Sequence, residues 1–137
     1  MRRKGVLGII IDKRKRFLIL YRVLHWTGWE FPKGGIDNET EEEALLREIK
    51  EETGLDAKII SRLPCEITYD YPKGFIKKAK TEYDGAKQSA YLLLANGNVK
   101  LSKEHKKYRW VSYKQARKLL KHESQKKALD IGYQYVI

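Results

Sequence analysis

The sequence predicts an α+β or mixed α/β fold in which helices pack on one sheet. Along its 137 residues, strand-sized apolar runs are followed by segments of helical spacing, and no repeat, linker or low-complexity tail interrupts them. The expected order is two strands, a loop, a helix, three strands and two helices. A chain of this length suits a single domain, residues 1–137, with a substantial core.

The amino-terminal part has the pattern of a β-hairpin. Residues 5–11 and 16–22 are apolar-rich, and a charged tetrapeptide between them is typical of a turn. Residues 29–31 alternate in polarity until Pro32 stops the strand, and the glycines at 34–35 predict a loop.

An acidic helix follows, and the sequence marks both of its ends. Thr40 with Glu43 three residues later forms a capping box. Gly54 suits the left-handed residue that ends a helix, which gives roughly 13 helical residues. Leu45 and Ile49 are expected to face the sheet, which leaves Glu48, Glu51 and Glu52 at its rim.

Three further strands and two helices are expected after this helix. Residues 57–71, 88–95 and 109–111 are strand-like, and residues 72–85 have the polar composition of a loop. Two helices are expected in the carboxyl-terminal part, over residues 113–121 and 124–135.

The charges divide the chain into an acidic segment and a basic remainder. Lys and Arg number 29 against 18 Asp and Glu, yet residues 37–56 hold nine of the acids and only two bases, Arg47 and Lys50. A metal bound by the acids and a phosphate chain bound by the bases would need such a division. Composition alone favours the plainer alternative, a solvated helix face and lysines that keep the protein soluble.

The composition also indicates in which compartment of the cell the protein is found. The longest apolar runs, such as residues 91–95, are far shorter than the ~20 residues of a membrane helix. The basic amino end lacks a small-residue cleavage site, so export is not expected. Cys65 is the single cysteine, which excludes an internal disulfide. We expect a cytoplasmic protein with no membrane contact and no obligatory protein partner.

Three glutamates of the acidic helix share one face. Glu48, Glu51 and Glu52 are spaced i, i+3 and i+4, and like charges at this spacing destabilise an isolated helix by about 0.2–0.5 kcal/mol per pair. A divalent cation between them would account for the arrangement, and carboxylates alone suit Mg²⁺ or Mn²⁺. Arg47, four residues before Glu51, is placed to orient that carboxylate by a charge-assisted bond.

The segment 47–55, Arg-Glu-Ile-Lys-Glu-Glu-Thr-Gly-Leu, resembles the core of the Nudix box. Glu39, eight residues before Arg47, matches the upstream glutamate of that box. The family pattern places five residues between its first glycine and this glutamate, whereas Gly34 is followed by only four, so the conformation of the loop is left open. The resemblance covers nearly the whole chain and implies an α/β/α sandwich with a mixed sheet.

The resemblance implies Mg²⁺- or Mn²⁺-dependent hydrolysis of a nucleoside diphosphate linked to another group, by attack of water on phosphorus. Glu48 and Glu52 would be metal ligands, and Glu51 would bind metal, act as the general base, or do both. Glu104 matches a further loop glutamate of related dinucleotide hydrolases and is expected to bind metal and to join Glu51 and Arg47 in catalysis. An exposed loop acid is the alternative for Glu104.

Two substrate classes are indicated. Residues 29–35, 101–110 and 128–135 resemble segments of diadenosine tetraphosphate (Ap4A) hydrolases, so the main hypothesis is cleavage of a dinucleoside polyphosphate such as Ap4A to ATP and AMP. Residues 69–73 and 85–88 resemble stretches of RNA 5′-pyrophosphohydrolases, which makes RNA 5′ ends the alternative substrate. A basic RNA-binding module that keeps the fold without catalysis is a third hypothesis.

Both substrates carry a polyphosphate and a base, so cations and an aromatic platform are expected around the metal. The resemblance implies that Lys33 and Lys87 contact phosphate. The candidate platforms are Tyr71, Tyr83, Tyr91 and Tyr133, with Tyr83 and Tyr133 included in the predicted site. An ordinary packing or surface role is the alternative for Lys87 and for each tyrosine.

Overall fold

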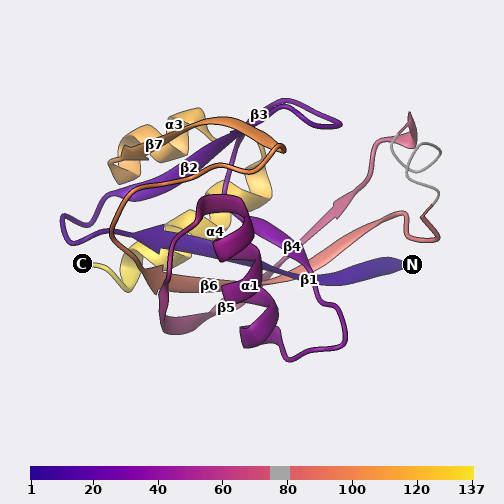
Figure 1. Cartoon of the computed structure of the whole chain (residues 1–137), viewed down its shortest axis with the longest axis horizontal. Helices are drawn as coiled ribbons and strands as arrows, with labels where there is room; N and C mark the ends of the chain where they lie inside the picture. Colours follow the sequence, from indigo (N-terminus) through magenta and orange to yellow (C-terminus); the bar gives the residue numbers. More distant parts are fainter. Residues whose placement is uncertain (75–80) are drawn as a thin grey trace.

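The structure, a computed structural model, describes residues 1–74 and 81–137 and contains a mixed sheet with helices on both faces (Figure 1). The expected loop over residues 72–85 falls in part on residues 75–80, which lie outside the described residues. The strands are β1 (Arg2–Ile11), β2 (Phe17–Arg22), β3 (Gly28–Glu30), β4 (Lys33–Gly35), β5 (Lys58–Asp70), β6 (Gly85–Leu94) and β7 (His105–Val111). The helices are α1 (Glu41–Thr53), α3 (Tyr113–Leu119) and α4 (Glu123–Gln134).

The central strand of the sheet is β1. The strand order is β3-β2-β1-β6-β5, with β4 paired to β1 and β7 paired to β2. β1 runs parallel to β6 along its whole length, and the other pairings are antiparallel. The predicted hairpin is present at its turn, where Ile11 pairs with Phe17, but β1 and β2 then diverge to different neighbours. Residues 5–11 of β1 are all buried, as the near-continuous apolar run of a central strand requires.

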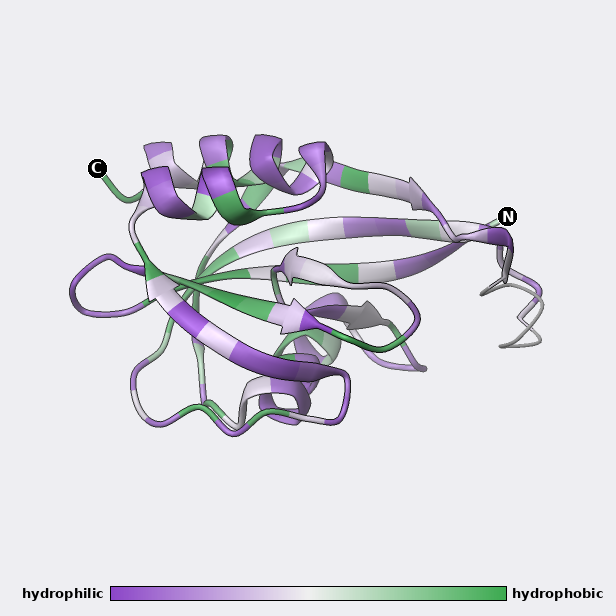
Figure 2. Ribbon diagram, turned by 90° about the horizontal axis from the view of Figure 1, so that it is seen from above, coloured by the Kyte–Doolittle hydropathy of each residue, from purple (hydrophilic) through white to green (hydrophobic). Residues whose placement is uncertain are grey.

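Two apolar cores lie on the two faces of this sheet. α1 covers one face with Leu45 and Ile49, as expected. α3 and α4 cover the other face, where Ala116, Ala128 and Leu129 are fully or almost fully buried. In Figure 2 the helices lie on opposite sides of the strands. The predicted sandwich with a mixed sheet is therefore confirmed. No helix in the described part of the chain is long and apolar enough to cross a membrane.

Both predicted ends of α1 are confirmed. The hydroxyl of Thr40 accepts a hydrogen bond from the backbone N–H of Glu43, and the Glu43 carboxylate accepts one from the backbone N–H of Thr40. Gly54 adopts the left-handed conformation, with φ of 74°, and its N–H donates to the carbonyl of Lys50. The helix that carries the predicted metal ligands therefore has fixed ends.

We expect Thr40→Ala to lower the free energy of unfolding by about 0.5–2 kcal/mol, because the backbone N–H of Glu43 loses the hydroxyl that accepts its hydrogen bond. Urea denaturation measures this loss. Thr40→Ser keeps the hydroxyl and is the matched control, so an equal loss in both variants would contradict the capping role.

A short strand, β4, occupies the position where the glycines predicted a loop, and that prediction was wrong. Gly34 and Gly35 pair with Val6 and Gly5 of β1. A side chain on Gly34 would place its Cβ 2.0 Å from the Cδ atom of Glu48, and one on Gly5 would lie 2.5 Å from the Gly34 carbonyl oxygen. Glycine is needed here for close packing of backbone and carboxylate, and not for a turn.

Candidate active site

A cavity of about 230 Å³ lies between the start of β1, β4 and the first residues of β6. Cations, aromatic rings and carboxylates meet in its wall. The cationic lining residues are Arg3, Lys4, Arg22 and Lys33, the aromatic ones include Trp26, Tyr69 and Tyr71, and the acidic ones are Glu48 and Glu104. This combination suits a polyphosphate that carries a base and binds with a divalent cation.

Arg47 ties the acidic loop to the helix. Its Nε atom donates to Glu39 at 3.0 Å, its Nη1 atom to Glu48 at 2.9 Å and its Nη2 atom to the carbonyl of Gly35 at 3.0 Å. The expected contact with Glu51 is present but is longer, at 3.3 Å. The hydrogen bonds to Glu39 and then those to Glu48 and Glu51 raise the pKa of Arg47, so it stays charged. Arg47 therefore orients carboxylates and is not placed in the cavity wall.

The three glutamates of α1 have different environments. The side chain of Glu51 is 57% exposed, that of Glu48 is 16% exposed and that of Glu52 is only 4% exposed. The expectation that all three lie at the rim of the sheet was wrong for Glu52. This residue is three positions after Ile49 and seven after Leu45, so it continues the buried stripe of the helix.

Burial perturbs two of these carboxylates. The pKa of Glu52 is raised well above its usual range, first by burial and then by the negative charges of Glu104 and Glu30. The pKa of Glu48 is also raised by burial, although its bond to Arg47 acts in the opposite direction. Converging carboxylates that are hard to ionise together indicate a place for a cation.

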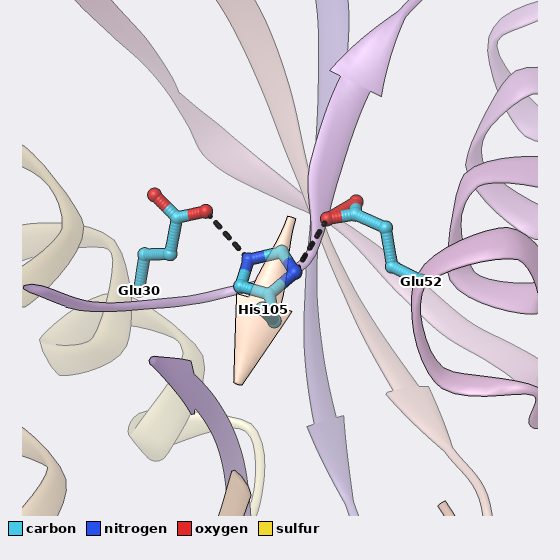
Figure 3. A group of neighbouring side chains, drawn as sticks. All are labelled: Glu30, Glu52 and His105. Atoms are coloured by element: carbon cyan, nitrogen blue, oxygen red, sulfur yellow. Dashed lines mark hydrogen bonds and ion pairs between the residues drawn. The ribbon is translucent and has the colours of Figure 1, made fainter. Parts of the chain in front are cut away.

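Two residues of the site, Glu30 and His105, were missed by the sequence reasoning. His105 Nε2 lies 2.9 Å from Glu30 Oε2, and His105 Nδ1 lies 3.8 Å from Glu52 Oε1 (Figure 3). Burial raises the pKa of Glu30, but Lys33, His105 and Arg22 together lower it to about 2. An acid at an inward position of a strand was the available signal for Glu30. No local pattern distinguished His105 from an exposed loop histidine.

Lys33 and Glu104, two of the predicted site residues, both line the cavity. Lys33 is buried, and its Nζ atom donates to the Tyr69 hydroxyl at 2.9 Å and lies 3.9 Å from Glu30 Oε1. Burial lowers the pKa of Lys33, but Glu30 and Tyr69 outweigh it and raise that pKa above its ordinary value. The Glu104 side chain is 41% exposed and lies 3.6 Å from Arg22 Nη1.

The structure does not bring the other three predicted substrate contacts to this cavity. Lys87 projects from the opposite face of β6 to its neighbour Gln88, which lines the cavity, and pairs with a glutamate of β5 at 3.7 Å. Tyr83 lines a separate hollow beside the start of β1. Tyr133 stacks on Tyr113, with ring centroids 4.1 Å apart. Contacts of Lys87, Tyr83 and Tyr133 with substrate remain predictions.

The residues present fit a divalent cation. Glu52 Oε1 is buried and has no hydrogen-bond partner within residues 1–74 and 81–137, while its Oε2 atom accepts from the backbone N–H of Lys33 at 3.2 Å. Gly34 leaves room for the Glu48 carboxylate only because it has no side chain. Glu48, Glu52 and Glu104 would hold the ion, and oxygen donors of this kind suit Mg²⁺ or Mn²⁺.

We expect Gly34→Ala to lower kcat by about tenfold or more, because the new methyl group must displace the Glu48 carboxylate and small displacements in active sites are costly. Gly74→Ala is the matched control, since a methyl group there would meet nothing within 4 Å. Both variants are compared in steady-state hydrolysis after circular dichroism has verified the fold. Full activity of Gly34→Ala would show that Glu48 is not held against this strand.

The fold, the carboxylate cluster and the cationic cavity define a hydrolase of pyrophosphate bonds, and the chain belongs to the Nudix family, whose NUDIX domain model matches residues 1–130. It is similar to the RNA pyrophosphohydrolase of a Nitratiruptor species, with 37% identity over 123 residues that cover 82% of this chain and 79% of the relative. The RNA pyrophosphohydrolase of Hydrogenovibrio crunogenus is 35% identical over 118 residues, which cover 77% of this chain and 72% of that protein.

Solved structures show the same fold. A Nudix hydrolase from Listeria monocytogenes superposes with a TM-score of 0.77 and 28% identity, over 96% of this chain and 92% of its own. An Ap4A hydrolase of C. elegans gives a TM-score of 0.77 with 24% identity, over 98% of this chain and 97% of its own. At that identity the likeness to the Ap4A hydrolase speaks for the fold alone.

Proposed function

We propose that this protein removes pyrophosphate from triphosphorylated RNA 5′ ends, with Mg²⁺ as the first candidate for its divalent cation. The observation that carries the proposal is the 37% and 35% identity with two RNA pyrophosphohydrolases over more than two thirds of each chain. The alternative from the sequence thereby replaces the main hypothesis, Ap4A hydrolysis, to which the comparisons add only the fold of a distant relative. The cytoplasmic location, the single domain and the lack of an obligatory partner stay predictions.

The cavity suits a 5′-triphosphate end. Arg3, Lys4 and Arg22 bring positive charge to its wall, and these groups would bind phosphate oxygens through charge-assisted hydrogen bonds. Tyr69 and Tyr71 bring aromatic rings to the same wall, and an aromatic ring can stack on a base of any identity. Binding of the terminal phosphates and of the first bases would thus use neighbouring parts of one cavity.

The cation and the side chains around it would have different roles in hydrolysis. A bound divalent cation would neutralise phosphate oxygens and make a water molecule nucleophilic. Because Glu48 and Glu104 line the cavity and Glu51 lies outside its wall, the first two are our candidates for the carboxylate that accepts the proton of the attacking water. Arg47 keeps Glu48 in place by a bond of 2.9 Å.

A basic strip on β7 and α3 supports a substrate longer than a dinucleotide. Residues 100–121 contain nine Lys and Arg and one acid, Glu104. Lys107 lies over the rings of Tyr21 and Trp29, with its Nζ atom 4.7 and 5.6 Å from their centroids, and Arg109 is exposed on the same strand. Because β7 begins next to Glu104, an RNA chain that leaves the cavity along β7 would meet these cations.

A substrate comparison tests the proposed function. Triphosphorylated RNA, Ap4A and nucleoside triphosphates are each incubated with the protein and Mg²⁺, and the products are identified. We expect pyrophosphate release from RNA with the highest kcat/KM. Release of ATP and AMP from Ap4A at a higher kcat/KM would overturn the proposal. RNA binding without any hydrolysis would instead support the non-catalytic module.

We expect the double variant Lys107→Glu, Arg109→Glu to raise KM about tenfold for a long triphosphorylated RNA, because each lost phosphate contact weakens binding to a polyanion. A triphosphorylated dinucleotide is too short to reach the strip and should keep its KM. The double variant Lys13→Glu, Lys58→Glu reverses two exposed lysines outside the strip and is the control for the change of charge. An equal rise in KM for both substrates would exclude a role of the strip in binding the RNA chain.

A further inference from the structure

Two buried atoms with lone pairs face each other beside α1, and neither has a hydrogen-bond partner in the described residues. They are His105 Nδ1 and Glu52 Oε1, 3.8 Å apart. The side chain of His105 is 0% exposed and that of Glu52 is 4% exposed. Leaving a buried polar group unpaired is costly, so two such atoms aimed at one another indicate that a positive species belongs between them.

The other side of the imidazole ring determines which nitrogen carries the hydrogen. Glu30 Oε2 lies 2.9 Å from His105 Nε2 and also accepts from Arg22 Nη1 at 3.2 Å. Lys33 Nζ is 3.9 Å from the second oxygen of the same carboxylate. With two cations beside it Glu30 is an anion, which can only accept, and therefore Nε2 donates. The lone pair of Nδ1 is left to point toward Glu52 (Figure 3).

Glu30, although it belongs to the same cluster, is already engaged. Its Oε2 atom is bonded to His105 and Arg22, and its Oε1 atom accepts from Trp26 Nε1 at 3.4 Å. A carboxylate that accepts from one imidazole nitrogen while the other nitrogen is free is the arrangement that orients histidine ligands in metal sites. Glu30 is thus a positioning residue, and His105 and Glu52 have the free donor atoms.

We propose that His105 Nδ1 and Glu52 Oε1 together bind a divalent transition-metal ion, which adds a nitrogen ligand to the carboxylates of the active site. Two metal–ligand bonds of about 2.0–2.2 Å can bridge the gap between these atoms. A nitrogen ligand favours transition-metal ions such as Co²⁺ and Zn²⁺ over Mg²⁺, which prefers oxygen ligands. The proposal rests on the metal-dependent part of the proposed function and is independent of the substrate.

Electron spin echo spectroscopy of the Mn²⁺-loaded protein without substrate tests the nitrogen ligand directly. We expect a nitrogen coupling that changes when histidine is labelled with ¹⁵N. The coupling should persist in His25→Asn and His122→Asn, the variants of the other two histidines, and disappear in His105→Asn. If His105→Asn does not fold, a nitrogen coupling that is present in the wild type and in both other variants still assigns the ligand to His105, because the chain has only three histidines.

Calorimetric titration provides the second measurement. We expect His105→Asn to raise the Kd for Co²⁺ by about tenfold or more and to change the Kd for Mg²⁺ far less. Absence of nitrogen coupling in the wild type would overturn the proposal and leave His105 as a hydrogen-bond acceptor from a protonated Glu52. An equal loss of both metals would also overturn it. Since no RNA is present, failure of the RNA hypothesis would leave both results unaffected.

Discussion

Glu48→Gln is expected to lower kcat for pyrophosphate release by about 10²–10⁴-fold, the contribution typical of a positioned acid–base group. Glu48 is the one glutamate of α1 that lines the cavity in the described structure, and its carboxylate is held between Arg47 and Gly34. The amide keeps the size of the side chain but removes the negative charge that a cation or a proton needs. Initial rates with triphosphorylated RNA measure the loss.

The matched control for this variant is Glu42→Gln, which makes the same change on the exposed side of the first turn of α1. Glu42→Gln should keep kcat, and both variants should unfold at similar urea concentrations. If Glu48→Gln kept its activity while Glu104→Gln lost it, the loop glutamate and not the helix glutamate would be the essential one.

Glu30→Gln is expected to lower the free energy of unfolding by about 3–5 kcal/mol, the cost of leaving a buried charge without its partner. The carboxylate of Glu30 is 1% exposed and lies 3.2 Å from Arg22 and 3.9 Å from Lys33, both of which are buried. Urea denaturation at neutral pH measures the difference. Glu66→Gln removes an acid from a half-exposed pair with Lys87 and should change stability by no more than about 1 kcal/mol.

The pH dependence of the stability difference between the wild type and Glu30→Gln shows whether the charge of Glu30 causes it. Because the pKa of Glu30 falls from 4.5 to about 2 on folding, its ionisation stabilises the protein fully above pH 4.5. The contribution is lost as the pH falls toward 2. The gap in stability between the wild type and Glu30→Gln should therefore narrow below pH 4.5. A gap that stays constant down to acid pH would mean that packing, and not the charge, is responsible.

Local rules predicted α1 well. The Thr40–Glu43 box and Gly54 are signals within a few residues, and the one-face spacing of Glu48, Glu51 and Glu52 follows from helix geometry. Continuing the apolar stripe from Leu45 and Ile49 by one more turn would also have predicted the burial of Glu52.

Contacts between residues far apart in the chain could not be predicted from the sequence. The contact of Glu30 with His105 joins residues 75 positions apart, and it depends on the pairing of β2 with both β3 and β7. β7 begins at His105, four residues before the predicted strand, because Lys106 to Arg109 are exposed and lack the apolar pattern of a buried strand. Lys87 faces away from the cavity because side chains alternate along β6 and its neighbour Gln88 faces the cavity. The sequence alone did not show how β6 pairs with β1, so it could not show which of the two residues faces the cavity.

Arg47 joins the two ends of the short loop between β4 and α1. One guanidinium group bonds the carbonyl of Gly35 at one end of the loop and the carboxylate of Glu39 at the other. A shorter connection also loses less chain entropy when its ends are brought together. The separation of strand and helix is thus set by this bridge and not by the number of residues between them. A loop whose ends are joined by one side chain can change its length with little displacement of Glu48, because the same guanidinium group also bonds that carboxylate.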